Sequence, residues 1–431
     1  MKTKRMNGIS VVLLSAVLLA ACGAKTSITK EEAAPSKEPV TIKIAARVAS
    51  LTDEEVKNYI TDPVKKKYPY ITVERIDNSQ KGQSLEELVA AGTVPDMVLE
   101  APLNLSALKL LGIDFNMDEM IKSAKMDLGR IQPEYLESIK VGTFSDYLSA
   151  LPIYNNGFAL FYNKDLFDKF GVSYPKDNMS WEDVRKLGEK LSRTDNGVAY
   201  VGLHPENLYR AAYQVSLPFL DTVNDKAVFQ TQGWKDLFEL WYQLYRQPDG
   251  GVIPKTIGAI SGFQKGQVAM VPAYTDLLQT LNKTKELNWD LVTYPQNPSA
   301  PGVGQRVDSF NLAITGTSKN KDAALRVIEV VLSEEVQTAM SRNGRVSVLK
   351  DRGVQDQYGQ AISDYQNKNV VALTKLKLAV VKPFKYAFPQ NPASLINEAF
   401  TNVLYNGKDI NTALREADEK MNKAIQDIVK K

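Results

Sequence analysis

Residues 157–167 read GFALFYNKDLF. The apolar run 157–163 predicts a buried strand, and the residues after Asn163 predict the start of a helix, so the stretch forms a strand-to-helix turn. A second apolar run, YLSALPIY at 147–154, precedes it and predicts another strand. Asn155, Asn156 and Gly157 separate the two runs and are typical of a turn.

Strand and helix patterns alternate toward the amino end of the chain. Short runs at 40–46, 71–76 and 96–100 predict strands, and the segments 52–60 and 84–92 between them predict helices. This alternation is typical of a largely parallel sheet with helices on both faces.

The helix starts are indicated by capping residues. Thr52 with Glu55, and Ser84 with Glu87, have the spacing of capping boxes, and Ser180 precedes a helical pattern. The carboxyl-terminal part is also helical in pattern, over 320–342, 391–406 and 410–429.

An aromatic stripe occurs in the predicted helix 232–246. Trp234, Phe238, Trp241 and Tyr245 recur at helical spacing. Such a stripe predicts core packing against the rest of the domain and not a platform for a sugar.

The amino terminus predicts a secretory signal peptide over residues 1–21. Lys2, Lys4 and Arg5 form a basic cluster, and 9–21 is an almost wholly apolar run that is too short for a transmembrane helix. Cys22 follows directly and is the single cysteine of the 431 residues. It has no partner for an internal disulfide.

Composition limits the class of protein. Without the leader the chain has 50 basic and 50 acidic residues, and this balance argues against a general nucleic-acid binder. The single histidine excludes a metal site with several His ligands, and no cofactor is expected. We find no hydrolase or nucleotide-binding motif. The length predicts two domains.

Residues 19–23, LAACG, resemble a bacterial lipoprotein box. The resemblance implies that Cys22 receives a diacylglycerol and that the chain is cut before it. Residues 22–39 would then form a lipid-anchored flexible tether on the outer face of the cell membrane.

Five further phrases resemble the extracellular solute-binding proteins of ABC importers, family 1, the sugar-binding type. They occur in the family's order along residues 40–428 and are AAGTVPD at 90–96, FYNKDLF at 161–167, SWED at 180–183, FQKGQVAM at 263–270 and SKNKDAA at 318–324. Each phrase alone is weak, but their order is specific.

The resemblance implies an α/β fold of the two-lobe periplasmic-binding-protein type (type II), with ligand in the interlobe cleft. The first lobe would be 40–152 plus 293–314, and the second 153–292 plus 315–431. Two to three crossings, near 150–156, 288–294 and 312–317, would form the hinge. Closure of the lobes would deliver the solute to the transmembrane subunits of an ABC permease, with the protein a monomer and not an enzyme.

Ligands of open α/β sheets lie beyond the carboxyl ends of the strands, so the polar and aromatic residues at those positions are the candidate ligand-binding residues. They are Arg47, Glu100, Asn104, Tyr154, Asn156, Glu206, Tyr209, Tyr274, Asp276, Arg306, Asp308 and Tyr386. Planar polar groups suit sugar hydroxyls, and an aromatic wall suits the apolar face of the ring. We therefore expect a carbohydrate, with an oligosaccharide favoured.

Two alternatives remain open for the function, and the solute itself is open too. The family often has a tryptophan shortly after the AM motif, whereas this chain has Val271-Pro272-Ala273-Tyr274. The ligand could therefore be an unusual oligosaccharide, a uronate or not a sugar. A sensory partner of a membrane receptor kinase would have the same fold, and a lipid-anchored glycoside hydrolase would need a carboxylate pair whose spacing a sequence does not reveal.

Overall fold

The computed structural model describes residues 38–47, 49–281, 287–380, 382 and 392–430. The chain divides into two units, Met1–Glu38 and Pro39–Lys431, and the description below concerns the second. The predicted signal peptide, Cys22, the tether as far as residue 37, and Tyr386 lie outside the described residues. No helix in the described part of the chain is long and apolar enough to span a membrane.

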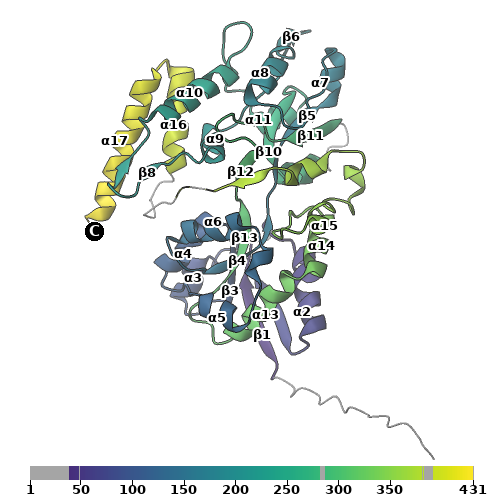
Figure 1. Cartoon of the computed structure of the whole chain (residues 1–431), viewed down its shortest axis with the longest axis vertical. Coiled ribbons are helices and arrows are strands. Elements are labelled where there is room, and N and C mark those ends of the chain that lie inside the picture. Colours follow the sequence, from purple (N-terminus) through teal and green to yellow (C-terminus); the bar gives the residue numbers. More distant parts are fainter. Residues whose placement is uncertain (1–37, 48, 282–286, 381, 383–391, 431) are drawn as a thin grey trace, which may run out of the picture. The chain divides into compact units, whose positions relative to one another are not determined.

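A five-stranded sheet forms the centre of the first lobe, with strand order β2-β1-β3-β13-β4. Its strands are β1 (Val40–Ala45), β2 (Ile71–Ile76), β3 (Met97–Glu100), β4 (Ala150–Asn155) and β13 (Ser309–Ile314). β1 is parallel to β2 and β3, whereas β13 is antiparallel to β3 and β4. The carboxyl ends of β1, β3 and β4 therefore lie at the end of the sheet where β13 begins (Figure 1).

Helices cover this sheet. They are α1 (Asp53–Val56), the π-helical turn η1 (Lys57–Thr61), α2 (Asp62–Lys67), α3 (Leu85–Ala90), η2 (Pro102–Asn104), α4 (Ser106–Leu110), α5 (Asp118–Ser123), η3 (Leu128–Arg130), α6 (Pro133–Thr143), α13 (Lys321–Val331) and α14 (Glu334–Arg342). The predicted capping boxes of Thr52 with Glu55 and of Ser84 with Glu87 are confirmed, since each pair exchanges hydrogen bonds in both directions. These bonds satisfy backbone N–H groups that have no partner inside the helix.

One hydrophobic cluster buries the sheet with its helices. It runs from Ile42 to Tyr154 and again from Val307 to Leu349. α13 belongs to it because its apolar face packs against β1, β4 and β13, with Val327 and Ile328 fully buried. The packing differs from the predicted boundary, which placed all of 315–431 in the second lobe.

A three-stranded sheet lies at the centre of the second lobe. β5 (Phe158–Asn163) is antiparallel to both neighbours, β10 (Met270–Tyr274) and β11 (Trp289–Thr293). The strand predicted at 157–163 is confirmed as β5. The Asn163 side chain accepts the backbone N–H groups of Asp165 and Leu166 and so begins the next helix, which confirms the strand-to-helix turn.

The remaining helices and hairpins either surround this second sheet or come after α14 in the sequence. The helices are α7 (Lys164–Lys169), α8 (Trp181–Glu189), α9 (Leu208–Gln214), α10 (Gln232–Tyr245), α11 (Ala259–Gln264), α12 (Asp276–Leu281), α15 (Arg352–Gln355), η4 (Ser363–Tyr365), η5 (Val370–Thr374), α16 (Pro392–Asn406) and α17 (Ile410–Val429). Two small hairpins are β6 (Arg193–Asp195) with β7 (Val198–Tyr200), and β8 (Leu220–Asp221) with β9 (Lys226–Ala227).

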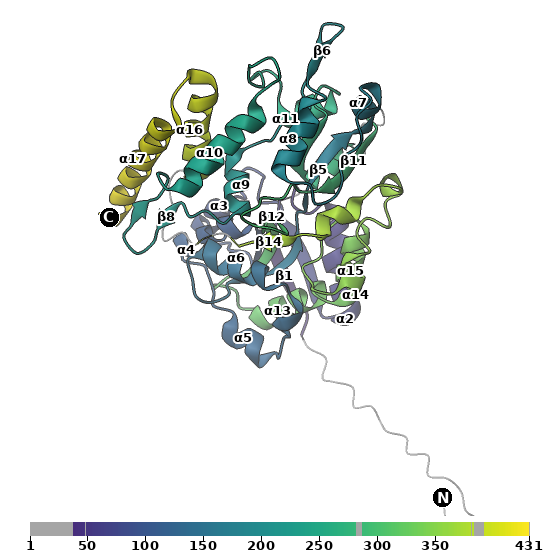
Figure 2. The same ribbon diagram turned by 45° about the horizontal axis from the view of Figure 1, so that its top comes forward.

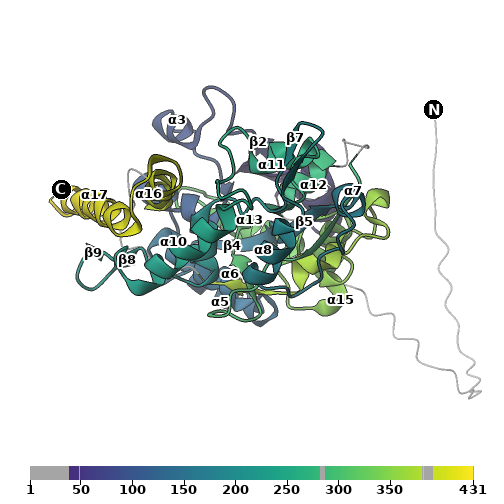
Figure 3. The ribbon, with the colours of Figure 1, turned by 90° about the horizontal axis from the view of Figure 1, so that it is seen from above.

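α10, α16 and α17 pack side by side, as Figures 2 and 3 show from two directions. The aromatic stripe of α10 is buried: Phe238 and Tyr245 contact Phe400 of α16, Trp241 contacts Trp181 of α8, and Trp234, Phe238 and Trp241 have no exposed surface. The interpretation of the stripe as core is therefore confirmed.

The chain passes between the two hydrophobic clusters after β4, before β13 and again between Leu349 and Tyr358. The first passage agrees with the crossing predicted near 150–156. Residues 288–294 lie within the second sheet instead, and 312–317 lie at the end of β13. The reason is β12 (Val303–Arg306), which packs on α9 and pairs with β14 (Lys377–Ala379) before the chain crosses.

Candidate functional site

Three predicted residues meet at the carboxyl ends of β1 and β3. An Arg47 guanidinium nitrogen lies 3.0 Å from Glu100 Oε1, and Asn104 Nδ2 donates to Glu100 Oε2 at 3.0 Å. The backbone carbonyl of Glu100 accepts from the buried Asn311 side chain. Glu100 is thus fixed on both carboxylate oxygens, while the Arg47 side chain is about half exposed and can reach a solute.

The passages after β4 and before β13 are joined by polar contacts. Asn156 Nδ2 donates to Asp308 Oδ2 at 3.0 Å, and the Asn156 backbone N–H donates to the Asp308 carbonyl at 3.1 Å. The Asp308 N–H in turn donates to Asn155 Oδ1 at 3.0 Å. Arg306 lies 3.9 Å from the other Asp308 oxygen, so three predicted residues gather at this point.

Tyr154 is held within the first lobe. Its hydroxyl donates to the Ser50 carbonyl at 2.5 Å, and its ring stacks on Phe310 with centroids 4.9 Å apart. Arg345 lies over the same ring at 4.7 Å. Burial raises the pKa of Tyr154 above its ordinary value, so the hydroxyl stays neutral. Its ring forms part of a wall and is fixed before any ligand binds.

A second group of candidate residues comes from α9, from the loop before it and from the end of β10. Arg210 Nε lies 3.2 Å from Glu206 Oε2, and the guanidinium lies 4.5 Å from the centroid of the Tyr274 ring. Phe158 meets Tyr274 edge-on with centroids 4.5 Å apart. Burial raises the pKa of Tyr274, which keeps its hydroxyl protonated as a hydrogen-bond donor. Tyr209 lies 5.4 Å from the same guanidinium.

Glu206 has a strained backbone at this position. Its φ is +66°, a left-handed conformation that costs a non-glycine residue about 1–2 kcal/mol. Its carbonyl accepts from Trp241 Nε1 at 3.2 Å and from the Tyr245 hydroxyl at 3.0 Å. Trp241 and Tyr245 of the aromatic stripe therefore hold the Glu206 backbone in place, and this positions the Glu206 carboxylate beside Arg210.

His204 supports this turn and does not act as a charged ligand. Its Nδ1 accepts the Glu206 backbone N–H at 3.2 Å. Burial lowers the pKa of His204 to about 4, so the ring is neutral at physiological pH. A neutral acceptor is what this hydrogen bond needs.

Two cavities adjoin at Asp276. One, of about 320 Å³, is lined by Phe158, Glu206, Arg210, Tyr274 and Asp276 with apolar neighbours. The other, of about 300 Å³, is lined by Tyr154, Asn156, Asp276, Phe310 and Arg345 among others. Asp276 is the one lining residue that the two cavities share, and of the predicted residues Tyr154, Asn156, Glu206, Tyr274 and Asp276 line one or the other. Arg47, Glu100, Asn104, Tyr209, Arg306 and Asp308 line neither cavity.

Several lining residues were not predicted from the sequence, and four of them are aromatic or basic: Phe158, Arg210, Phe310 and Arg345. Arg210 has one sequence signal, its i+4 spacing from Glu206, which suits an ion pair on a helix. The other three sit at strand starts or after a helix end, where a sequence pattern gives no direction to a side chain.

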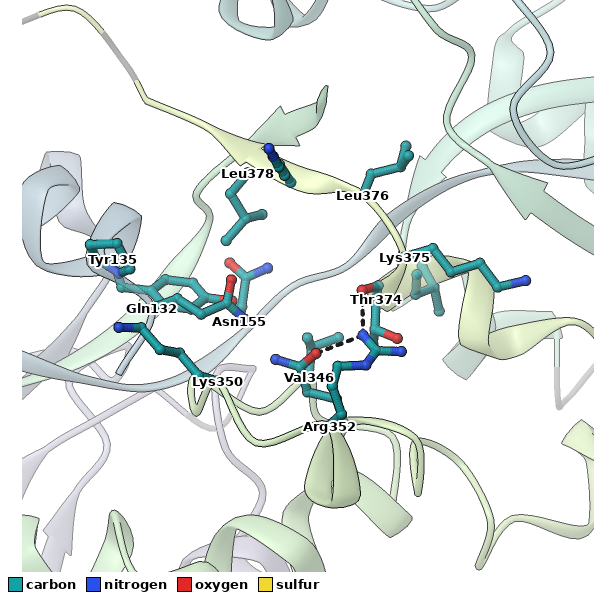
Figure 4. A pocket seen from close by; sticks show the side chains of 14 residues that line it. Gln132, Tyr135, Asn155, Val346, Lys350, Arg352, Thr374, Lys375, Leu376 and Leu378 are labelled. Atoms are coloured by element: carbon teal, nitrogen blue, oxygen red, sulfur yellow. Dashed lines mark hydrogen bonds between the residues drawn. The ribbon is translucent and has the colours of Figure 1, made fainter. Parts of the chain in front are cut away.

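A third cavity, of about 290 Å³, lies where the segment 373–378 passes over Asn155 and Val346 (Figure 4). The Arg352 guanidinium donates to Gln355 Oε1 and to the Thr374 carbonyl there, as the dashed lines in Figure 4 indicate. None of the predicted ligand-binding residues lines this cavity.

The chemistry of the two adjoining cavities is that of recognition. Carboxylates, guanidinium groups and amides offer directional hydrogen bonds, and tyrosine and phenylalanine rings offer apolar contact. Within the described residues no group of three or more His, Cys, Asp or Glu side chains is placed to hold a metal ion.

The chain belongs to a known family. Residues 60–364 match the model of the bacterial extracellular solute-binding protein family. This match confirms the family resemblance that the sequence motifs indicated.

The fold is similar to that of solved solute-binding proteins. The sugar-binding protein MalE from Xanthomonas citri aligns with a TM-score of 0.72 and 19% identity, over 90% of this chain and 98% of that one. The cyclic alpha-maltosyl-1,6-maltose binding protein from Arthrobacter globiformis gives 0.73 and 16%, over 90% and 100%. UgpB from Mycobacterium tuberculosis, in complex with glycerophosphocholine, gives 0.68 and 15%, over 91% and 100%. The predicted periplasmic-binding-protein fold is thereby confirmed.

Proposed function

We propose that this protein captures a carbohydrate, with an oligosaccharide favoured, outside the cell. The observation that supports this most is the pairing of Arg210 and Glu206 against the Tyr274 and Phe158 rings in one cavity. A sugar presents hydroxyls along its edges and C–H groups on its faces. Planar charged groups beside an aromatic wall match both.

The captured solute would pass to an ABC permease, and Cys22 would carry the lipid that keeps the protein at the membrane. Membership of the solute-binding family supports the first part, and the LAACG stretch at 19–23 supports the second. The protein would act as a monomer without a cofactor, and it would make or break no bond in the solute. Closure of the lobes would be the step that the permease reads.

The first test is thermal unfolding of the form beginning at residue 23 against mono- and oligosaccharides, uronates, polyamines and peptides. A ligand at 100 times its dissociation constant stabilises the folded state by about 2.7 kcal/mol. We expect a shift with a saccharide class. A shift with a peptide or a polyamine and with no saccharide would contradict the proposal.

Variants of Tyr274 locate the binding. Tyr274→Ala should weaken the affinity for the saccharide about tenfold or more, whereas Tyr274→Phe should keep most of it. Tyr174→Ala is the matched control, since that ring contacts Tyr162 at the other end of β5. Equal effects of the alanine changes at 274 and 174 would place the solute elsewhere.

The anchor has its own test. Cys22→Ser should release the protein from the membrane fraction into the medium, because it removes the site of acylation. Retention of Cys22→Ser in the membrane fraction would contradict the anchor and leave the binding proposal untouched.

A further inference from the structure

Two arginines lie among tyrosines in the region of the candidate site. Arg210 is on α9 and lies over Tyr274, and Arg306 is on β12 and lies 4.6 Å from the centroid of the Tyr213 ring. Tyr209 and Tyr213 are one turn apart on α9, with ring centroids 5.7 Å apart. The arginine side chains are only 17% and 15% exposed. The aromatic faces therefore shield both guanidinium groups from water.

The two guanidinium groups have many more donors than partners. Each guanidinium offers five N–H donors. In the part of the chain that the structure describes, these two guanidinium groups make one hydrogen bond to a protein acceptor, from Arg210 Nε to Glu206 Oε2. Arg306 lies beyond hydrogen-bond length from Asp308, and its buried Nε has no partner in the described part of the chain. A shielded cation with unused donors is costly unless an acceptor arrives.

We infer that the solute is an acidic saccharide, whose sugar ring bears a carboxylate that Arg306 and Arg210 receive. This inference rests on the proposed function and narrows its substrate class. A guanidinium binds a carboxylate through parallel, charge-assisted hydrogen bonds, which are about twice as strong as bonds between neutral groups. The tyrosine rings would contact the sugar to which the carboxylate is attached.

The surrounding charges favour a carboxylate over a phosphate. Glu206 and Asp276 line the same cavity as Arg210, and Asp308 lies 3.9 Å from Arg306, so a dianion would meet more repulsion at either arginine than a carboxylate with a single charge. Asp308 Oδ2 and Glu206 Oε2 already accept hydrogen bonds from Asn156 and Arg210. A single negative charge uses the free donors at a smaller repulsive cost.

The test compares each acid with its own neutral ester. Galacturonate, glucuronate and their disaccharides are titrated calorimetrically into the form beginning at residue 23, beside the methyl ester of each and the neutral parent sugar. We expect the best acid to bind about tenfold or more tightly than its ester, and its affinity to fall as salt rises.

Arg306→Gln should remove this preference. The acid should lose about tenfold in affinity, while the ester changes much less, because its carbonyl has no charge for the guanidinium to meet. Arg306→Lys retains the positive charge but loses the paired N–H donors of the guanidinium. Its affinity for the acid should therefore lie between those of the unchanged protein and Arg306→Gln. Arg185→Gln on α8, a partly buried arginine paired with Glu182 and Glu189, is the matched control and should bind solute as the unchanged protein does.

The outcomes separate the inference from the function. Equal affinity for acid and ester, tighter binding of a neutral sugar, or tighter binding of a sugar phosphate would overturn the acidic saccharide and leave carbohydrate capture standing. If no saccharide of any kind binds, the proposed function falls together with the inference.

Discussion

Glu206 joins backbone strain to the candidate site. Its positive φ is held by two buried donors of α10, and its carboxylate lies beside Arg210. Strained backbone persists where the surrounding structure holds it in place, and it is concentrated at functional positions. The strain here positions a charged group at the start of α9.

Replacing Glu206 separates the strain from the side chain. Both Glu206→Gly and Glu206→Ala remove the carboxylate, but glycine adopts a positive φ freely. We expect the glycine variant to be about 1 kcal/mol more stable than the alanine variant in urea unfolding, and both to bind solute weakly. Equal stabilities would show that the turn carries no strain.

The ion pair of Glu55 and Arg345 makes stability depend on pH. Arg345 Nε and a second guanidinium nitrogen lie 2.6 and 2.9 Å from the two Glu55 oxygens, and both side chains are mostly buried. Burial alone would raise the pKa of Glu55, but hydrogen bonding and charge attraction from Arg345 outweigh it, and the pKa is lowered. A lowered pKa means that the folded state favours the charged form.

Glu55→Gln should therefore reduce the free energy of unfolding by about 2 kcal/mol at pH 7. The native pair contributes fully above the ordinary glutamate pKa of 4.5, and its contribution is lost as the pH falls through the lowered value. The difference between the two proteins should thus shrink below pH 4.5 in urea titrations. Glu86→Gln, on the exposed face of α3, is the control; a difference that stays constant with pH would contradict the linkage.

At the scale of single residues, the sequence indicated which charged and aromatic side chains could bind a ligand, but not which residues those side chains contact. Glu100 and Asn104 were predictable because both follow a strand whose carboxyl end faces the other lobe. The ring that Arg210 contacts depends on where β10 and β5 place Tyr274 and Phe158, and no local pattern carries that information. Tyr386 and Cys22 stay predictions, since both lie outside the described residues.

At the scale of elements, Gln337 of α14 links three parts of the first lobe. Its amide nitrogen donates to the Ile153 carbonyl of β4 at 2.8 Å and to the Val331 carbonyl of α13 at 3.1 Å. Its oxygen accepts from the Ser347 hydroxyl at 2.8 Å. The side chain is fully buried, so each of these bonds replaces a bond to water.

Gln337→Leu should cost about 2–4 kcal/mol in unfolding free energy, because it leaves buried backbone and hydroxyl groups without partners. Chemical denaturation measures the loss. Gln360→Leu, at an exposed position, should change stability by less than about 0.5 kcal/mol. A small effect at 337 would mean that the lobe repacks around an apolar side chain.

Helix starts and turns were predictable where the residues that determine them lie within the same short segment of the sequence. The capping boxes of α1 and α3 and the turn after β5 follow from side chains that bond their own backbone. The membership of α13 was not predictable in this way. Its apolar stripe would suit either sheet, and the choice depends on β13, which inserts between β3 and β4 from far along the chain.

At the scale of the whole molecule, the first lobe is assembled from two separated stretches. Its hydrophobic cluster takes residues up to Tyr154 and then those from Val307 to Leu349. Without the second stretch, β3 and β4 have no strand between them. The lobe is thus one cooperative body made of distant pieces.

A pair of fragments tests this organisation. Residues 39–156 alone should remain unfolded in circular dichroism, because they lack β13 and α13 and expose the apolar surface that both cover. The same residues joined by a short Gly/Ser linker to 307–349 should fold cooperatively. Folding of 39–156 alone would contradict the dependence on β13.

The position of β13 also orders events when the chain is made. A chain grows from its amino end, so β1 to β4 exist well before residues 309–314 have been added. Through that interval the future first lobe lacks the strand that belongs between β3 and β4, and we expect it to remain unfolded. The export that we propose from the predicted signal peptide would benefit from this delay, because the leading part of the chain would stay unfolded until most of the chain has followed.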